Sequence, residues 1–189
     1  MNNDLSELVD FLSRGRKYAS FFEWPDKEQK ELGVTEELIT TLNATESLGL
    51  KNLTICRPDP PDITCSGARN ERVAIEVSEI VCRDAVKANQ KGQEVFRIWA
   101  QGELQFAIAD RLSRKDKCKL HGAPYERFYA CLFTDEMMLT HDGVAVELAD
   151  AKFGPFEQIT DAFLLFSYQS STQSYPVLRL SVAEGKIGD

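Results

Sequence analysis

The chain has 189 residues, of which 43% are hydrophobic and 10% aromatic, and its formal charge is 22 − 30 = −8. This length and composition favour one folded domain and exclude fibrous and intrinsically disordered classes. The acidic balance also excludes a protein that coats nucleic acid by overall charge neutralisation.

The apolar runs, the N-terminal residues and the cysteines indicate in which cellular compartment the protein is expected. No apolar run is long enough to cross a bilayer, and residues 1–15 are acidic and interrupted where a signal peptide is basic and then apolar. We therefore expect a cytoplasmic protein with no membrane partner. The five cysteines are dispersed without a CxxC pair, which predicts reduced thiols, and the two histidines form no zinc-binding pattern.

The first half of the chain predicts helices followed by strands. Apolar residues recur at spacings of three and four over residues 5–22 and 34–50. Thr35 is typical of a helix cap and Gly49 of a helix stop. Short segments rich in β-branched residues predict a β-hairpin or meander. The expected strands are residues 53–56, 62–66 and 72–81.

The second half predicts a long helix followed by further strands. The proline-free stretch 84–118 is periodic and predicts one helix with a bend near Gly102. Residues 144–154 fit either a small strand or part of a helix. Apolar runs predict the remaining strands at residues 128–134, 162–168 and 177–182.

This order of elements predicts an α/β fold in which helices flank a mixed central sheet. We divide the single domain, residues 1–189, into three parts. They are an N-terminal helical extension (1–34), a core (35–134) and C-terminal strands (135–189).

Two acidic residues in the expected hairpin are the strongest candidates for chemistry. Asp62 opens one strand and Glu76 lies 76 − 62 = 14 positions later in the next strand. In an antiparallel pair, the start of one strand lies beside the end of the next, so the two carboxylates converge at one sheet edge. A cation between them relieves their repulsion, and hard oxygen ligands suit Mg²⁺ or Mn²⁺.

Strand alternation places Glu76 on the face opposite Ile75 and Val77. A carboxylate in such an apolar strand requires a metal ion or a cationic partner, because unpaired burial costs several kcal/mol. The alternatives are purely structural roles, in which Asp62 caps a turn and Glu76 pairs with an arginine such as Arg72.

Pro61-Asp62 followed after a hairpin by Ile75-Glu76-Val77-Ser78 resembles the PD-(D/E)XK nuclease superfamily. The chain also resembles uncharacterised bacterial proteins with similar PPD and IEVTEL motifs, which are usually placed in the same superfamily. The likeness extends over residues 46–133 and implies a restriction-endonuclease-like αβββαβ core. It also implies that Asp62, Glu76, the Val77 carbonyl and Glu46 are metal ligands.

The sequence departs from this pattern at the lysine position, which is Ser78. Serine cannot supply the positive charge that stabilises a phosphorane-like transition state. Some members of the superfamily take that charge from the following helix, and on this basis Lys115 is our candidate for the catalytic cation, with Arg111 and Lys119 as alternatives. The residues expected to contact a nucleic-acid backbone are Arg111, Arg114, Lys117 and Lys119.

The resemblance implies a Mg- or Mn-dependent phosphodiester hydrolase, an endonuclease-like enzyme acting on DNA or RNA. Two alternatives remain open. One is a catalytically inactive nuclease-like fold that serves as a binding or regulatory subunit, which the acidic net charge favours. The other is a binding module in which both carboxylates are structural. The expected partner is nucleic acid, DNA before RNA, and a homodimer or a partner protein is open.

Overall fold

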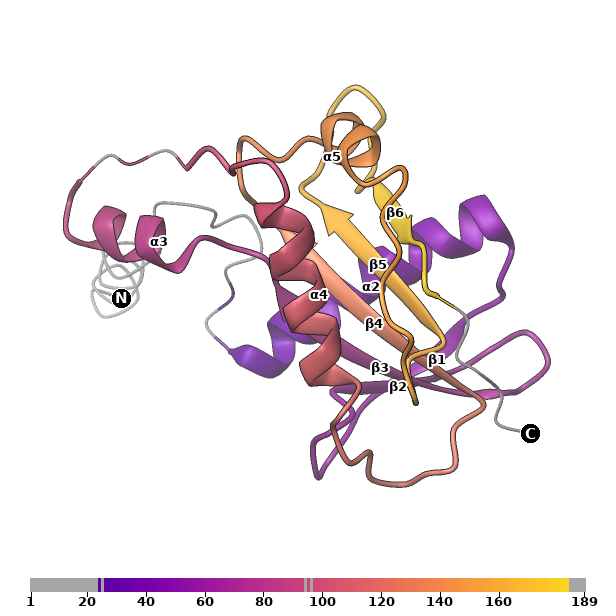
Figure 1. Ribbon diagram of the computed structural model, residues 1–189. Helices are drawn as coiled ribbons and strands as arrows, with labels where there is room; N and C mark the ends of the chain where they lie inside the picture. Colours follow the sequence, from indigo (N-terminus) through magenta and orange to yellow (C-terminus); the bar gives the residue numbers. More distant parts are fainter. Residues whose placement is uncertain (1–23, 25, 94, 96, 184–189) are drawn as a thin grey trace, which may run out of the picture.

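The computed structural model describes residues 24, 26–93, 95 and 97–183 (Figure 1). It shows an α/β fold with one mixed six-stranded sheet in the order β1-β2-β3-β4-β5-β6. The strands are β1 (Lys51–Ile55), β2 (Ile63–Ser66), β3 (Arg72–Glu79), β4 (Arg127–Thr134), β5 (Asp161–Phe166) and β6 (Val177–Leu180). The helices are α2 (Lys27–Glu46), α3 (Arg83–Gln90), α4 (Glu103–Lys115) and α5 (His141–Glu147).

The sheet joins an antiparallel meander to a parallel centre. Strands β1, β2 and β3 pair antiparallel, β3, β4 and β5 pair parallel, and β6 returns antiparallel to β5. The near-continuous apolar run of β4 is buried from Phe128 to Thr134 because helices cover both faces of the sheet. The mixed sheet flanked by helices is therefore confirmed.

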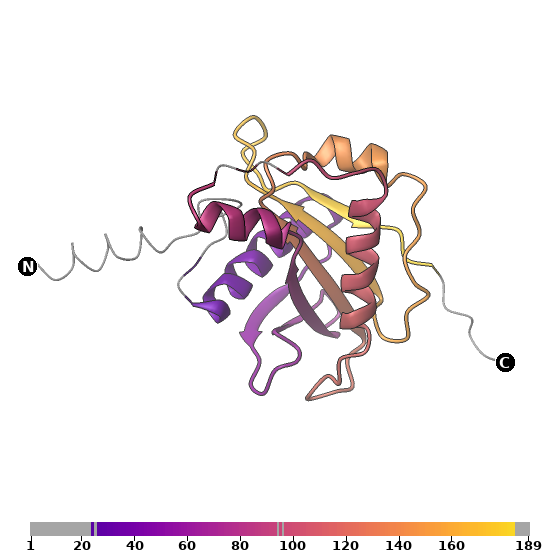
Figure 2. The same cartoon turned by 60° about the vertical axis from the view of Figure 1, so that its left-hand side comes forward.

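The two faces of the sheet carry separate cores. Helices lie on both faces (Figures 1 and 2). Helix α2 packs Val34, Leu38 and Leu42 against one face, which includes Ile75 and Val77. Helices α4 and α5 cover the other face. Each such buried aliphatic side chain contributes about 1.5–3 kcal/mol. The opposite faces predicted for Glu76 and its apolar neighbours are confirmed.

Helix α2 starts earlier than predicted, at Lys27 rather than near Thr35. Asp26 is its cap, since its Oδ1 accepts the backbone N–H of Gln29 at 3.0 Å. Thr35 is buried inside the helix and donates its hydroxyl to the Glu31 carbonyl at 2.8 Å. The helix expected over residues 5–22 lies outside the described residues.

The single helix predicted over residues 84–118 is wrong. Helix α3 ends at Gln90, and α4 begins only after Gly102. Gly92, just after α3, and Gly102, just before α4, have φ values of +78° and +77°, a left-handed conformation that interrupts a helix and that glycine adopts without strain. The ambiguous stretch 144–154 begins in helix α5. Among the described residues, no helix has the length and apolar character needed to span a membrane.

Candidate functional site

Asp62 and Glu76 lie directly beside each other, at the point where β2 begins. Strand register pairs Ile63 with Ile75, so one further step places Asp62 opposite Glu76. The backbone N–H of Asp62 donates to Glu76 Oε1 at 3.1 Å, and the backbone N–H of Val77 donates to Asp62 Oδ2 at 2.8 Å. The two residues are only 5% and 2% exposed. Each carboxylate is thus fixed by the backbone of the strand opposite.

The backbone of Val77 is directed toward Asp62 and Glu76. Strand β2 pairs with β3 only as far as Ile75, so the following β3 residues have no strand partner on that side. The N–H and C=O of one strand residue point to the same side, because paired residues exchange both bonds. The Val77 carbonyl is therefore directed to the edge where Asp62 lies.

Lys115 approaches this pair of carboxylates from the face of the sheet that α4 covers. It is the last residue of α4, and its Nζ forms a hydrogen-bonded ion pair with Glu76 Oε2. The same Nζ lies 3.7 Å from Asp62 Oδ2, and the lysine side chain is only 19% exposed. The two carboxylates and the lysine that the sequence singled out are therefore in contact in the structure.

Three further charged residues belong to this group, and the sequence reasoning missed them. Lys27 Nζ lies 3.1 Å from Glu31 Oε1, 3.2 Å from Asp59 Oδ2 and 3.7 Å from Asp62 Oδ1. Oxygens of Asp59, Asp62 and Glu76 lie within 4.8 Å of one another. We call Lys27, Glu31, Asp59, Asp62, Glu76 and Lys115 the carboxylate site.

Two signals in the sequence pointed to these residues. Lys27 and Glu31 have the i,i+4 spacing of neighbours on one helix face, which is informative only once the helix is known to start at Lys27. Asp59 lies in the short loop that leads to Asp62. That loop is held in place by the backbone N–H of His121, which donates to the Pro60 carbonyl at 2.7 Å.

Burial and crowding of like charges perturb the titration of the carboxylate site. Burial, followed by repulsion from Asp62, raises the pKa of Glu31 to about 7. Burial and Asp62 also raise the pKa of Glu76, against the opposing effect of Lys115. Burial by itself lowers the pKa of Lys115, but Glu76 and Asp62 outweigh it and hold its pKa above the ordinary value. The two carboxylates therefore favour the charged form of Lys115.

Glu46, predicted as a further ligand, does not join the carboxylate site. It is the last residue of α2, and it pairs with Arg179 on β6. Glu31 on the same helix lies 46 − 31 = 15 residues earlier, or about 22 Å at 1.5 Å per residue. The preceding helix therefore does present a glutamate to Asp62, but that residue is Glu31.

The basic residues expected to bind nucleic acid are only partly gathered near the carboxylate site. Arg111 lies one turn before Lys115 on α4 and is half-buried, and burial and then repulsion from Arg83 lower its pKa. Arg114 is exposed and pairs with Asp110 at 3.0 Å. Lys117 and Lys119 are exposed in the loop after α4. Ser78 is half-buried on β3.

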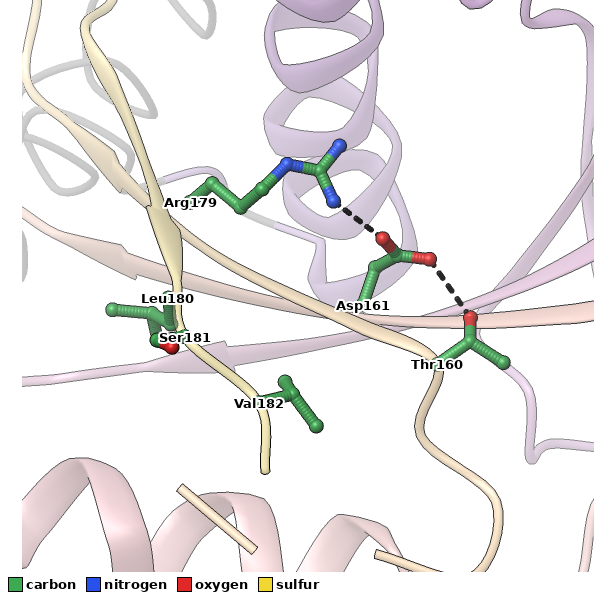
Figure 3. A pocket seen from close by; sticks show the side chains of 6 residues that line it. All are labelled: Thr160, Asp161, Arg179, Leu180, Ser181 and Val182. Atoms are coloured by element: carbon green, nitrogen blue, oxygen red, sulfur yellow. Dashed lines mark hydrogen bonds and ion pairs between the residues drawn. The ribbon is translucent and has the colours of Figure 1, made fainter. Parts of the chain in front are cut away.

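A second group of charges lies at β5 and β6, where a surface cavity of about 380 Å³ opens (Figure 3). Arg179 pairs with Asp161 and Glu46, and Arg127 pairs with Asp161 at 3.2 Å. The Thr160 hydroxyl donates to Asp161 Oδ2 at 2.9 Å. We call Glu46, Arg127, Asp161 and Arg179 the β5–β6 cluster.

No protein-family model, curated protein or solved structure matches the chain. What either group of charges can do chemically therefore rests on its own geometry.

Proposed function

We propose that this protein is a divalent-metal-dependent phosphodiester hydrolase, a divergent member of the PD-(D/E)XK superfamily acting on DNA or RNA. The observation that carries the proposal is the buried pair of Asp62 and Glu76, held across adjacent strands with the Lys115 ammonium against both. Burying this pair is expensive unless cations compensate it, so its presence at an open strand edge calls for a function.

The order of elements also supports this proposal. Helix α2, strands β1 to β3, helix α4 and strand β4 follow the αβββαβ order that the resemblance implies, with α3 as an additional short helix between β3 and α4. Asp62 and Glu76 occupy the first two positions of the motif within that order. This agreement concerns the succession and pairing of elements, and it makes the restriction-endonuclease-like core the preferred interpretation.

The donor set fits a hard divalent cation. Asp59, Asp62 and Glu76 offer carboxylate oxygens, and the Val77 carbonyl is directed to the same edge, a combination that suits Mg²⁺ or Mn²⁺. When all four carboxylates are ionised, the four carboxylates and two lysines of the carboxylate site have a formal charge of −4 + 2 = −2. One divalent ion neutralises that charge. When bound there, such an ion lowers the pKa of a coordinated water and neutralises a scissile phosphate.

Lys115 supplies the charge that the motif lacks at Ser78. Its ammonium is fixed by Glu76, remains protonated and lies beside Asp62. Placed there, it stabilises negative charge that develops on a phosphate next to Asp62. Arg111, one turn earlier on the same helix, together with Arg114, Lys117 and Lys119, would contact the nucleic-acid backbone on this side of the sheet.

The test is cleavage of plasmid, single-stranded DNA and RNA with Mg²⁺, Mn²⁺ or EDTA. Asp62→Asn and Glu76→Gln keep the shapes of the two side chains and remove one charge each. We expect each to reduce cleavage about 10²–10³-fold, the effect of removing a group that stabilises transition-state charge. Asp161→Asn, in the β5–β6 cluster, is the matched control and should leave cleavage unchanged. Equal activity in all four proteins, or activity that persists in EDTA, contradicts the proposal.

A catalytically inactive binding subunit is the second candidate, and one observation favours it. Glu76 already has a backbone donor and a buried ammonium as partners, which neutralise it without a metal ion. This candidate predicts nucleic-acid or partner binding that persists in Asp62→Asn and needs no divalent ion. The same set of variants, measured by binding in EDTA, separates the two candidates.

A further inference from the structure

Lys27 and Lys115 approach the same carboxylate from opposite sides, and their surroundings differ. Lys27 Nζ lies 3.7 Å from Asp62 Oδ1, and Lys115 Nζ lies 3.7 Å from Asp62 Oδ2. The Lys27 side chain is 67% exposed, whereas that of Lys115 is 19% exposed. One cation is therefore enclosed in the protein and the other borders on water.

The two oxygens of Asp62 differ in the same way. Oδ2 accepts the Val77 N–H at 2.8 Å and lies near Lys115, so its position is fixed. Among the described residues, Lys27 alone approaches Oδ1, at 3.7 Å. Lys27 thus covers the oxygen of Asp62 that is least committed to the protein.

The position of Lys27 is unfavourable for the helix to which it belongs. It is the first residue of α2, where the helix dipole favours anions and disfavours cations. Its contacts with Glu31 and Asp59 as well as Asp62 explain why a cation is nevertheless placed there. The role of Lys27 thus concerns the carboxylates and not the helix.

We propose that Lys27 is the exchangeable counter-ion of the carboxylate site, which occupies the position between Asp59 and Asp62 until a divalent ion displaces it. This inference rests on the proposed metal-binding function. An ammonium and a divalent ion compete for the same two carboxylates because like charges repel at such distances. The long, exposed lysine stem lets the ammonium withdraw into water, whereas enclosed Lys115 keeps its place beside Glu76.

The test compares Mn²⁺ binding by titration calorimetry, and the Mn²⁺-dependent rise in melting temperature, in wild type and Lys27→Met. Methionine keeps the stem and removes the competing charge. We expect the Kd for Mn²⁺ to fall about three- to tenfold and the Mn²⁺-dependent rise in melting temperature to increase. Lys27→Arg, which retains the charge, should bind Mn²⁺ as wild type does.

Lys30→Met is the matched control on the same helix. Its ammonium lies 5.9 Å from the centre of the Phe133 ring, and among the described residues it contacts no carboxylate. Unchanged binding in this variant, together with tighter binding in Lys27→Met, supports the inference. Equal or weaker Mn²⁺ binding by Lys27→Met overturns it while leaving the metal site intact. If neither wild type nor Lys27→Met binds Mn²⁺, both the inference and the proposed function fail.

Discussion

The carboxylate site and the β5–β6 cluster are both groups of charged side chains that gather beside the sheet, but their charges balance differently. The β5–β6 cluster has two carboxylates and two guanidinium groups, a formal charge of −2 + 2 = 0. The carboxylate site has four carboxylates and two ammonium groups, a formal charge of −2. The charges of the β5–β6 cluster therefore cancel, whereas those of the carboxylate site do not.

The two groups of charges also differ in burial. Glu46 and Arg179 are about a third or more exposed, whereas the side chains of Asp62 and Glu76 are 3% and 2% exposed. Exposed, balanced pairs contribute modestly to stability and need no function to account for them. A buried group with excess charge costs stability, so it is the better candidate for a functional site.

Removing one cation from each group of charges is the strongest test of this difference. Lys115→Met leaves two buried carboxylates facing each other, and we expect the free energy of unfolding to fall by about 3 kcal/mol. Arg179→Met should cost about 1 kcal/mol, because Asp161 retains Arg127 and Thr160 as partners. Urea denaturation of both variants, measured without divalent ions, compares the two losses.

A double variant separates charge from packing in that experiment. Glu76→Gln in the Lys115→Met background removes the uncompensated buried charge, so much of the lost stability should return. Equal losses in Lys115→Met and Arg179→Met, with no recovery in the double variant, would show that the two groups of charges are energetically alike.

The sequence predicted the sheet well because strand periodicity is a local property. Each expected strand from residues 53–56 to 177–182 has a counterpart displaced by a few residues at its ends. The helices were harder to delimit. Residues 84–118 continue a helical pattern across Gly92 and Gly102, and apolar spacing alone does not show whether a glycine bends a helix or ends it.

The carboxylate site was predictable where it depends on strand register. The contact between Asp62 and Glu76 follows from the hairpin. Lys115 was named because the resemblance implies a positive charge that Ser78 does not supply, and its contact with Glu76 is present in the structure. Lys27, Glu31 and Asp59 depend on where α2 begins and how the loop before Asp62 folds. Those features are set by tertiary packing. The helix expected over residues 34–50 contains Glu46 but not Glu31, so the resemblance pointed to Glu46.

The smallest effect that we expect is on Mn²⁺ binding when the charge of Glu31 is removed. Above the pKa of Glu31, which is about 7, Glu31→Gln removes a negative charge near Asp62 and releases Lys27 to pair more fully with Asp59 and Asp62. Both changes oppose cation binding, and we expect the Kd for Mn²⁺ to rise about two- to fourfold. Titration calorimetry measures the change directly.

Glu46→Gln is the control, since it removes the same charge from the same helix. Its carboxylate belongs to the β5–β6 cluster and lies beyond the Debye length of about 8 Å from the carboxylate site, so Mn²⁺ binding should not change. If Glu46→Gln weakens Mn²⁺ binding as much as Glu31→Gln does, the two groups of charges are coupled through α2. The excess charge of the carboxylate site then cannot be counted separately, and the argument for a divalent ion there loses its electrostatic basis.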